Sequence, residues 1–162
     1  MKLQLITYIL ALIFVTGCSK EPNLIYSAPT SEQITMYVTS NNLEVLDSIW
    51  IKDSALILLK NSFITLYSDQ NEKLYDQKIT WASNNKEIIT VGNGIPYIAI
   101  IIGDDLMDIG AAYLNVEYSD GKIESRGISD KKGLLLSSFS HATVQNISVI
   151  NAKDEVIYSK SR

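Results

Sequence analysis

Three observations predict that this chain is an all-β protein built from packed antiparallel strands. From Gln33 onward, short apolar runs alternate with polar residues at a period of two, as expected of half-buried strands. The runs are rich in Ile, Val, Thr and Tyr, which suit a pleated sheet. Asn, Asp, Ser and Gly gather between the runs, where turns are expected. Short strands at near-regular spacing are typical of a β-sandwich or barrel.

Residues 1–17 predict a secretory signal peptide rather than a part of the fold. Their apolar run, Leu5–Val15, is shorter than the ~20 residues that a membrane-spanning helix needs. The run ends in Val15-Thr16-Gly17-Cys18, which resembles the lipobox of bacterial lipoproteins. This resemblance implies cleavage before Cys18, whose thiol would carry a diacylglycerol and whose amino group would be acylated, for example with palmitate. Several acyl chains together give stable attachment to a membrane.

The residues that follow the lipobox predict the cellular location of the protein and a tether between its lipid anchor and the folded domain. In Gram-negative lipoproteins, a residue other than Asp after the lipidated Cys usually goes with outer-membrane sorting, and this chain has Ser19. The outer membrane of the cell envelope is therefore the favoured location if the host is Gram-negative. Residues 18–32 contain two prolines and many polar residues, and they predict a flexible tether. In the alternative, Leu24, Ile25 and Tyr26 dock on the folded domain.

The β-domain is expected to span residues 33–162. Its first strand would begin at Gln33 and would bury Ile34, Met36 and Val38. The other strands are expected at 43–46, 49–51, 55–59, 63–67, 78–81, 88–91, 97–102, 112–118, 122–125, 134–137, 144–150 and 156–158. No substantial helix is expected, and 104–110 would form at most one short helical turn.

The clearest hairpin signal is Ser119-Asp120-Gly121-Lys122. Asp-Gly accepts the two positive φ angles of a type I′ turn, whose twist matches its flanking strands. The sequence therefore predicts a tight type I′ hairpin between 112–118 and 122–125.

Residues 76–122 resemble the group 2 bacterial immunoglobulin-like domain of invasin- and intimin-type adhesins. The matching residues are Ile79-Thr80-Trp81-Ala82-Ser83-Asn84, Ile89-Thr90-Val91, Asn93-Gly94, Ile98-Ala99, Gly103 and Tyr118-Ser119-Asp120-Gly121-Lys122. The resemblance implies an immunoglobulin-like β-sandwich. In such a fold Trp81 is expected to fill space between two sheets, since bulky aromatics bury large areas.

The chain departs from this family at two places. Residues 104–110 are inserted where the family has a tight turn, and about forty residues follow Lys122. We expect these to add strands to one continuous domain, with half of a second small sandwich as the alternative. A transthyretin-like β-sandwich, common in periplasmic lipoproteins, fits the strand count almost as well, and 128–136 loosely resembles its turn-and-strand unit.

Composition excludes several classes of function. The net charge is −4 and no basic stripe is present, which argues against a nucleic-acid binder. A single Cys excludes an internal disulfide framework and a Cys-rich zinc site, and a single His excludes a multi-His metal cluster.

Two weak candidate sites remain. Asp104, Asp105 and Asp108 offer hard oxygen ligands for Ca²⁺, but the DxDxDG loop is absent, and a solvated acidic turn is the favoured interpretation. Ser140 and His141 suggest a nucleophilic pair, yet adjacent strand residues point to opposite faces, and no GxSxG motif is present. We therefore expect no catalytic residue, no cofactor and no enzyme activity.

Tyr37, Tyr97 and Tyr113 are candidate anchors for a partner, because exposed tyrosines often carry binding energy. The expected function is a lipid-anchored adhesion or binding module with a protein, cell-surface or envelope partner, which pairs through a sheet face or edge. The alternative is a structural accessory lipoprotein of a larger envelope assembly, such as a secretion or conjugation apparatus. An enzyme on an unusual β scaffold is the third and weakest hypothesis.

Overall fold

The structure is a computed structural model that describes residues 25–82, 87–128, 132–137 and 142–162. The signal peptide, Cys18 and the Ser140-His141 pair lie outside these residues. Within them the chain forms three antiparallel sheets and two helices, α2 (Ser31–Ser40) and α3 (Asp104–Asp108). The predicted all-β, sandwich-like fold class is confirmed. Neither helix is long and apolar enough to cross a bilayer.

The three sheets divide the chain by sequence. The first sheet holds β1 (Tyr26–Ser27), β2 (Val45–Ile51), β3 (Ser54–Leu59), β4 (Ser62–Asp69) and β5 (Leu74–Thr80). The middle sheet holds β6 (Ile89–Gly92), β7 (Tyr97–Ile101) and β10 (Gly133–Ser137). The third sheet holds β8 (Ala111–Tyr118), β9 (Ile123–Gly127), β11 (Val144–Asn151) and β12 (Val156–Ser161).

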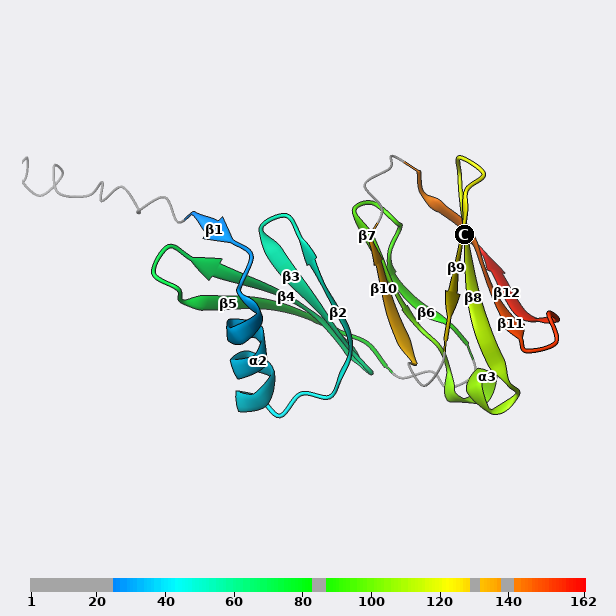
Figure 1. The fold of residues 1–162 in the computed structure, drawn as a ribbon, viewed down its shortest axis with the longest axis horizontal. Coiled ribbons are helices and arrows are strands. Elements are labelled where there is room, and N and C mark those ends of the chain that lie inside the picture. Colours follow the sequence, from blue (N-terminus) through cyan, green and yellow to red (C-terminus); the bar gives the residue numbers. More distant parts are fainter. Residues whose placement is uncertain (1–24, 83–86, 129–131, 138–141) are drawn as a thin grey trace, which may run out of the picture.

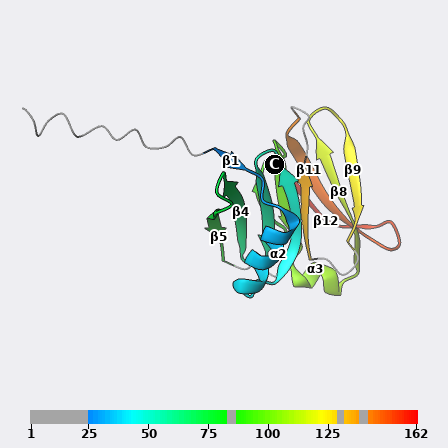
Figure 2. The ribbon, with the colours of Figure 1, turned by 60° about the vertical axis from the view of Figure 1, so that its left-hand side comes forward.

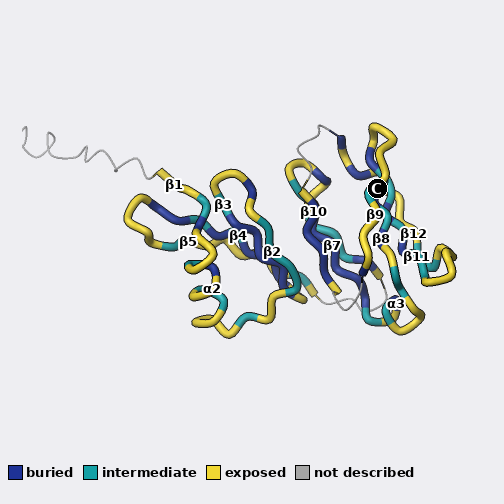
Figure 3. The backbone as a smooth tube through the Cα atoms, viewed as in Figure 1, coloured by how far each residue is buried: buried dark blue, intermediate teal, exposed yellow. Residues whose placement is uncertain are grey.

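The sheets stack with the middle sheet shared between two cores (Figures 1 and 2). On β7, Ile98 and Ile100 pack toward the third sheet, whereas Ala99 and Ile101 pack toward the first. Because successive strand residues point to opposite faces, a strand buried on both faces reads as one unbroken apolar run. Figure 3 shows β7 and β10 buried along most of their length.

The predicted first strand is wrong, because residues 31–40 form the helix α2. A capping box begins the helix: Thr30 Oγ1 accepts from the Gln33 N–H at 3.2 Å, and Gln33 Oε1 accepts from the Thr30 N–H at 2.8 Å. The apolar stripe is Ile34, Tyr37 and Val38, spaced three and four residues apart, and it packs on the outer face of the first sheet. Met36 is 61% exposed, so the alternation that suggested a strand was accidental.

The predicted tether contains an ordered segment. Tyr26 pairs with Asp69 and Ser27 with Ser68, so β1 extends the first sheet at the end of β4. The docking alternative is therefore what the structure shows for Tyr26.

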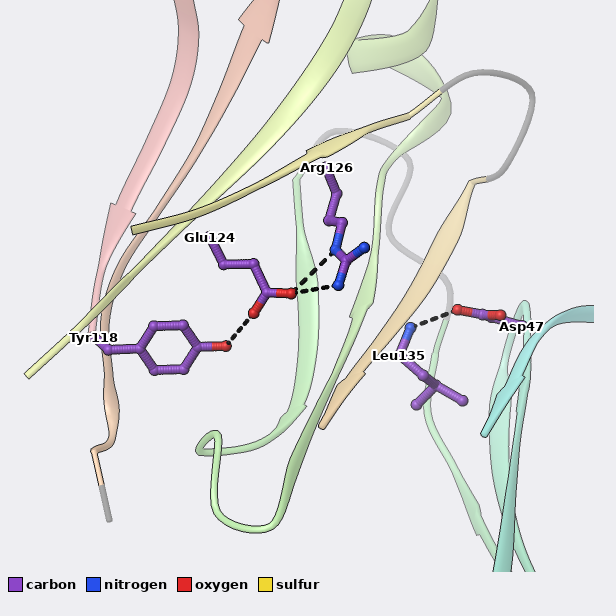
Figure 4. A network of polar contacts seen from close by, with 5 residues as sticks. All are labelled: Asp47, Tyr118, Glu124, Arg126 and Leu135. Carbon is purple, nitrogen blue, oxygen red and sulfur yellow. Dashed lines mark hydrogen bonds and ion pairs between the residues drawn. The ribbon is translucent and has the colours of Figure 1, made fainter. Parts of the chain in front are cut away.

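The first and middle sheets pack closely against each other around Gly133. A Cβ on Gly133 would lie 2.8 Å from Leu46 Cδ1 and 3.0 Å from Leu58 Cδ2, so glycine is needed there. Asp47 Oδ2 accepts a hydrogen bond from the Leu135 N–H at 2.8 Å and covers a main-chain donor on the edge strand β10 (Figure 4). Trp81 packs, partly buried, in the same core, between these two sheets.

The hairpin at Asp120-Gly121 is confirmed, but its predicted turn type is wrong. Gly121 has φ +81°, whereas Asp120 is not among the residues with positive φ. The Gly121 N–H donates to Tyr118 O and the Tyr118 N–H to Lys122 O, which describes a three-residue loop with a glycine bulge. Asp120 instead uses Oδ1 to accept from the Lys122 N–H at 3.1 Å.

The remaining strands largely follow the prediction. The runs expected at 43–46 and 49–51 merge in one strand, β2, which begins only at Val45, and β5 begins at Leu74 rather than at Lys78. The helical turn expected at 104–110 is α3. Residues after Lys122 complete two sheets, because β10 pairs with β7 while β9 and β11 pair with β8. Residues 76–122 contribute strands to all three sheets.

Candidate functional site

Within the candidate acidic cluster of Asp104, Asp105 and Asp108, Asp104 forms two ion pairs. Asp104 Oδ1 lies 2.7 Å from Lys132 Nζ, and its Oδ2 lies 3.4 Å from Lys60 Nζ. The hydrogen bond from Lys132 and the charges of both lysines lower the pKa of Asp104. Among the described residues, no three His, Cys, Asp or Glu side chains gather where they could hold a metal ion. Asp104 thus links α3 to the β3–β4 turn and the start of β10 rather than facing Asp105 and Asp108 across a site.

The three tyrosines proposed as anchors lie in different settings. Tyr113 is 46% exposed on the outer face of the third sheet. Tyr97 stacks on Phe63 with ring centroids 5.1 Å apart, and burial raises its pKa. Tyr37 lies on α2, partly buried against the first sheet, and burial and the nearby Asp76 carboxylate raise its pKa. Only Tyr113 of the three is largely exposed.

A different set of tyrosines forms a pocket at the far end of the first sheet. Tyr26, Tyr67 and Tyr75 line it together with Asp76 and Gln77, and its volume is about 460 Å³. The Tyr26 ring lies 5.9 Å from Tyr67 and 5.6 Å from Tyr75, in tilted and edge-to-face arrangements. Tyr26 is 41% exposed. The rings of three tyrosines therefore gather in one place, and that of Tyr26 is exposed.

Strand register explains why these rings meet. Tyr67 lies directly opposite Tyr75, and Asp69 lies directly opposite Tyr26, so all four side chains share one face of the sheet. The middle sheet packs on the part of this face around Leu58 and Phe63, nearer the β2 side. The aromatic end extends beyond that packed core.

Asp69 organises the hairpin beneath the pocket. Its Oδ1 accepts from the N–H groups of Asn71 at 2.8 Å and Lys73 at 2.9 Å, and its Oδ2 accepts from the Tyr75 hydroxyl at 3.2 Å. Burial acts to raise the pKa of Asp69, but these hydrogen bonds and the Lys73 charge lower it on balance. Lys73 Nζ also lies 4.9 Å from the centre of the Tyr75 ring. The carboxylate thus fixes Tyr75 in the pocket.

The pocket adjoins a free sheet edge. Among the described residues β5 pairs only with β4, and Figure 2 shows β5 at the outer side of the first sheet. Bonds at both ends of the hairpin, Asp69 N–H to Lys73 O and Trp81 N–H to Asn61 O, set which residues face β4. In an antiparallel pair, residues whose main-chain groups bond to the neighbouring strand alternate with residues whose main-chain groups point away from it. Tyr75, Gln77 and Ile79 therefore bond to β4. The main-chain groups of Leu74, Asp76, Lys78 and Thr80 point outward.

A second polar network lies on the third sheet, where Tyr118, Glu124 and Arg126 bond to one another (Figure 4). The Tyr118 hydroxyl donates to Glu124 Oε2 at 3.2 Å, and Arg126 donates to Glu124 Oε1 at 2.7 and 3.0 Å. Burial, followed by the Glu124 charge, raises the pKa of Tyr118 to about 12. Each member already has its partner, which indicates a structural role.

Sequence reasoning missed the pocket, although one signal was present. Tyr67 and Tyr75 are equally distant from the centre of the 69–73 turn, so a hairpin there makes them cross-strand neighbours. Tyr26 gave no signal, because a two-residue strand has no period to detect. No protein-family model, no curated protein and no solved structure matches this chain.

Proposed function

We propose that this chain is a lipid-anchored, non-catalytic binding or adhesion module of the bacterial envelope. The observation that carries the proposal is the open pocket of Tyr26, Tyr67 and Tyr75 beside the free edge of β5. Tyrosine supplies large, rigid contact area together with a hydroxyl, and it is enriched in binding interfaces. The outward main-chain groups of β5 offer a second, directional means of recognition.

The chemistry of the pocket favours recognition over catalysis. Its lining supplies phenol rings, the Gln77 amide and the Asp76 carboxylate, which interacts with the Tyr37 hydroxyl of α2. The nearby carboxylate of Asp69 is already held by two main-chain N–H groups and Tyr75. A general base must reach a substrate proton, and Asp69 is occupied and only 5% exposed.

The proposed anchor places this surface near a membrane. A chain extends at most ~3.6 Å per residue, so Tyr26 would lie within about 29 Å of Cys18 and the lipid attached to it. Partners of the pocket would then be molecules at, or attached to, the same membrane surface.

The anchor is tested by replacing Cys18 with Ser in the full-length chain. The variant is expected to move from the membrane fraction to the soluble fraction, because no acyl chain can then be attached. Retention of the variant in the membrane fraction would contradict a lipid anchor.

The binding surface is tested by photocrosslinking in intact cells. A photoreactive phenylalanine analogue at Tyr26 is expected to form covalent adducts, whereas the same analogue at the exposed Tyr113 serves as the matched control. Adducts absent from both positions, or identical at both, would contradict a binding role for the pocket. A single envelope complex captured in equal amounts would favour the alternative, a structural accessory lipoprotein.

A further inference from the structure

We propose that the partner at the β5 edge is a second copy of this chain, paired antiparallel with Gln77 of each copy on a two-fold axis. The inference deepens the proposed function, on which it rests, by naming one partner of that surface. It comes from the order of side chains along β5, which reads Leu-Tyr-Asp-Gln-Lys-Ile-Thr from 74 to 80.

Charge complementarity selects this register. With Gln77 on the axis, Asp76 of each copy lies opposite the partner's Lys78, so two opposite-charge pairs form. A shift of one residue in each copy toward the C-terminal end would set Lys78 opposite the partner's Lys78. The corresponding shift toward the N-terminal end would set Asp76 opposite the partner's Asp76. Both shifts create like-charge contacts, which are destabilising.

The pattern of outward-pointing main-chain groups along β5 also permits this register. The outward main-chain groups belong to Leu74, Asp76, Lys78 and Thr80. In the proposed pairing 74 lies opposite the partner's 80, and 76 lies opposite the partner's 78. Every outward group therefore meets another outward group.

The same pairing accounts for the apolar side of the edge. Residues directly opposite each other share a face, so Tyr75 would meet the partner's Ile79 on the pocket side. Ile79 is 54% exposed and lies on the same face as the tyrosines. Its side chain would cover part of the pocket wall that Tyr75 forms, and the two-fold axis repeats this contact.

The edge strand β9 shows why the pattern of β5 is informative. β9 also has an acid and a base two residues apart, but Arg126 binds Glu124 of its own strand at 2.7 and 3.0 Å. On β5, Lys78 forms no ion pair with any described residue, and Asp76 interacts with the Tyr37 hydroxyl of α2 but with no described cation. Both side chains are exposed. Charged side chains usually protect an edge strand against pairing with another strand. The order of Asp76 and Lys78 on β5 is likewise unfavourable for most strands, but it is complementary to the same strand of a second copy.

The interface is small. Seven residues a side fall well below the ~20–30 a side of a standard stable interface, so dilute soluble protein is expected to dimerise weakly. Confinement of both copies to one membrane raises their effective concentration.

The test uses the full-length chain in its native membranes. In the variant Gln77→Cys, two cysteines on the axis would form a non-hydrogen-bonded pair with Cα atoms ~4.5 Å apart, within the range for a disulfide. A disulfide-linked dimer is expected on non-reducing gels. Thr80→Cys, on the same exposed strand, is the control, since its two copies would lie ~20 Å apart. The parent chain, which retains Cys18, controls for crosslinking through that residue.

Charge reversal gives the second measurement, in the Gln77→Cys background. Asp76→Lys is expected to lower the dimer fraction about tenfold, because two attractive pairs become repulsive, and adding Lys78→Asp is expected to restore it. Equal crosslinking from Gln77→Cys and Thr80→Cys, no dimer, or no rescue by the double reversal would overturn the proposal. If the dimer fails while position 26 still captures another protein, the binding function stands and only the identity of its partner is wrong.

Discussion

The first and third sheets both pack on the middle sheet, yet they differ in how many of their faces are covered. The first sheet has α2 on its outer face, and its strand β3 is buried on both sides, with Leu56 and Leu58 facing inward and Ile57 facing the helix. The third sheet has a solvent-facing side, and on β8 buried Leu114 and Val116 alternate with more exposed residues. An unbroken apolar run therefore indicates a strand that is buried on both faces. Alternation of apolar and polar residues indicates a sheet with one solvent-exposed face.

The two sheets also differ at their edges. β9 of the third sheet keeps its charges paired internally through Glu124 and Arg126. β5 of the first sheet presents Asp76 and Lys78 to solvent beside an aromatic pocket. This difference between the two edge strands is the basis of the proposed pairing of β5 with a second copy of the chain.

The largest expected effect comes from adding one methyl group between the first and middle sheets. Gly133→Ala would force its Cβ to within 3.0 Å of Leu46 and Leu58, and overpacking of this kind costs about 1–3 kcal/mol of unfolding free energy. Urea unfolding followed by tryptophan fluorescence measures this loss.

Gly127→Ala in the third sheet is the matched control. No atom lies within 4 Å of its added Cβ, and alanine is favoured over glycine in a strand by about 0.5–1 kcal/mol. Equal losses of unfolding free energy at both positions would show that Gly133 is not packed more tightly than Gly127, contrary to the structure.

The sequence was sufficient to predict most strands, because each is either an alternating run with one buried face or an unbroken apolar run buried on both faces, and turn-forming residues lie between the runs. It was insufficient at α2, where Ile34, Met36 and Val38 imitate a strand while Thr30 and Gln33 carry the capping signal. The pairing of β10 with β7 was also hidden, since local periodicity carries no information about which distant strands pair. For the same reason Tyr26 could not be assigned to a site with Tyr67 and Tyr75.

The next prediction compares two hairpins built in the same way. Asp69 in the first sheet and Asn151 in the third each accept two main-chain N–H groups through Oδ1, but only Asp69 is charged. The pKa of Asp69 is lowered in the fold, so its contribution to stability is present above its ordinary pKa of ~3.9 and is lost as the pH falls through the folded value. Asp69→Asn should be less stable than the parent near pH 7, and the two should converge at low pH.

Unfolding free energies measured from pH 7 down to pH 3 check this convergence. Asn151→Asp provides the control in the third sheet, since it should make the stability of that hairpin depend on pH. The new carboxylate would accept the same two main-chain N–H groups but would lie beside the Glu155 carboxylate, to which the Asn151 amide donates at 2.8 Å. A constant difference between Asp69→Asn and the parent at every pH would show that the charge of Asp69 is irrelevant to the hairpin.

The smallest expected effect lies in the same two turns. Glu72 and Asp154 occupy equivalent positions with φ +64° and +63°, a conformation that costs a non-glycine residue about 1 kcal/mol. Glu72→Gly and Asp154→Gly should each stabilise the fold, by less than that amount because glycine also gains entropy in the unfolded chain. Thermal unfolding should show a rise in Tm of about 2–4 °C at most for each.

Gly121 supplies the control, because it holds the equivalent position in the β8–β9 hairpin with φ +81°. Gly121→Ala should lower the Tm, and nothing within 4 Å of its Cβ would add a steric contribution. The two gains should be equal, since both hairpins share the bond from the positive-φ residue back to Asp69 or Asn151. A gain confined to Asp154→Gly would contradict this equality, because the main-chain carbonyl of residue 72 can still accept from Gln33 of α2 after the substitution.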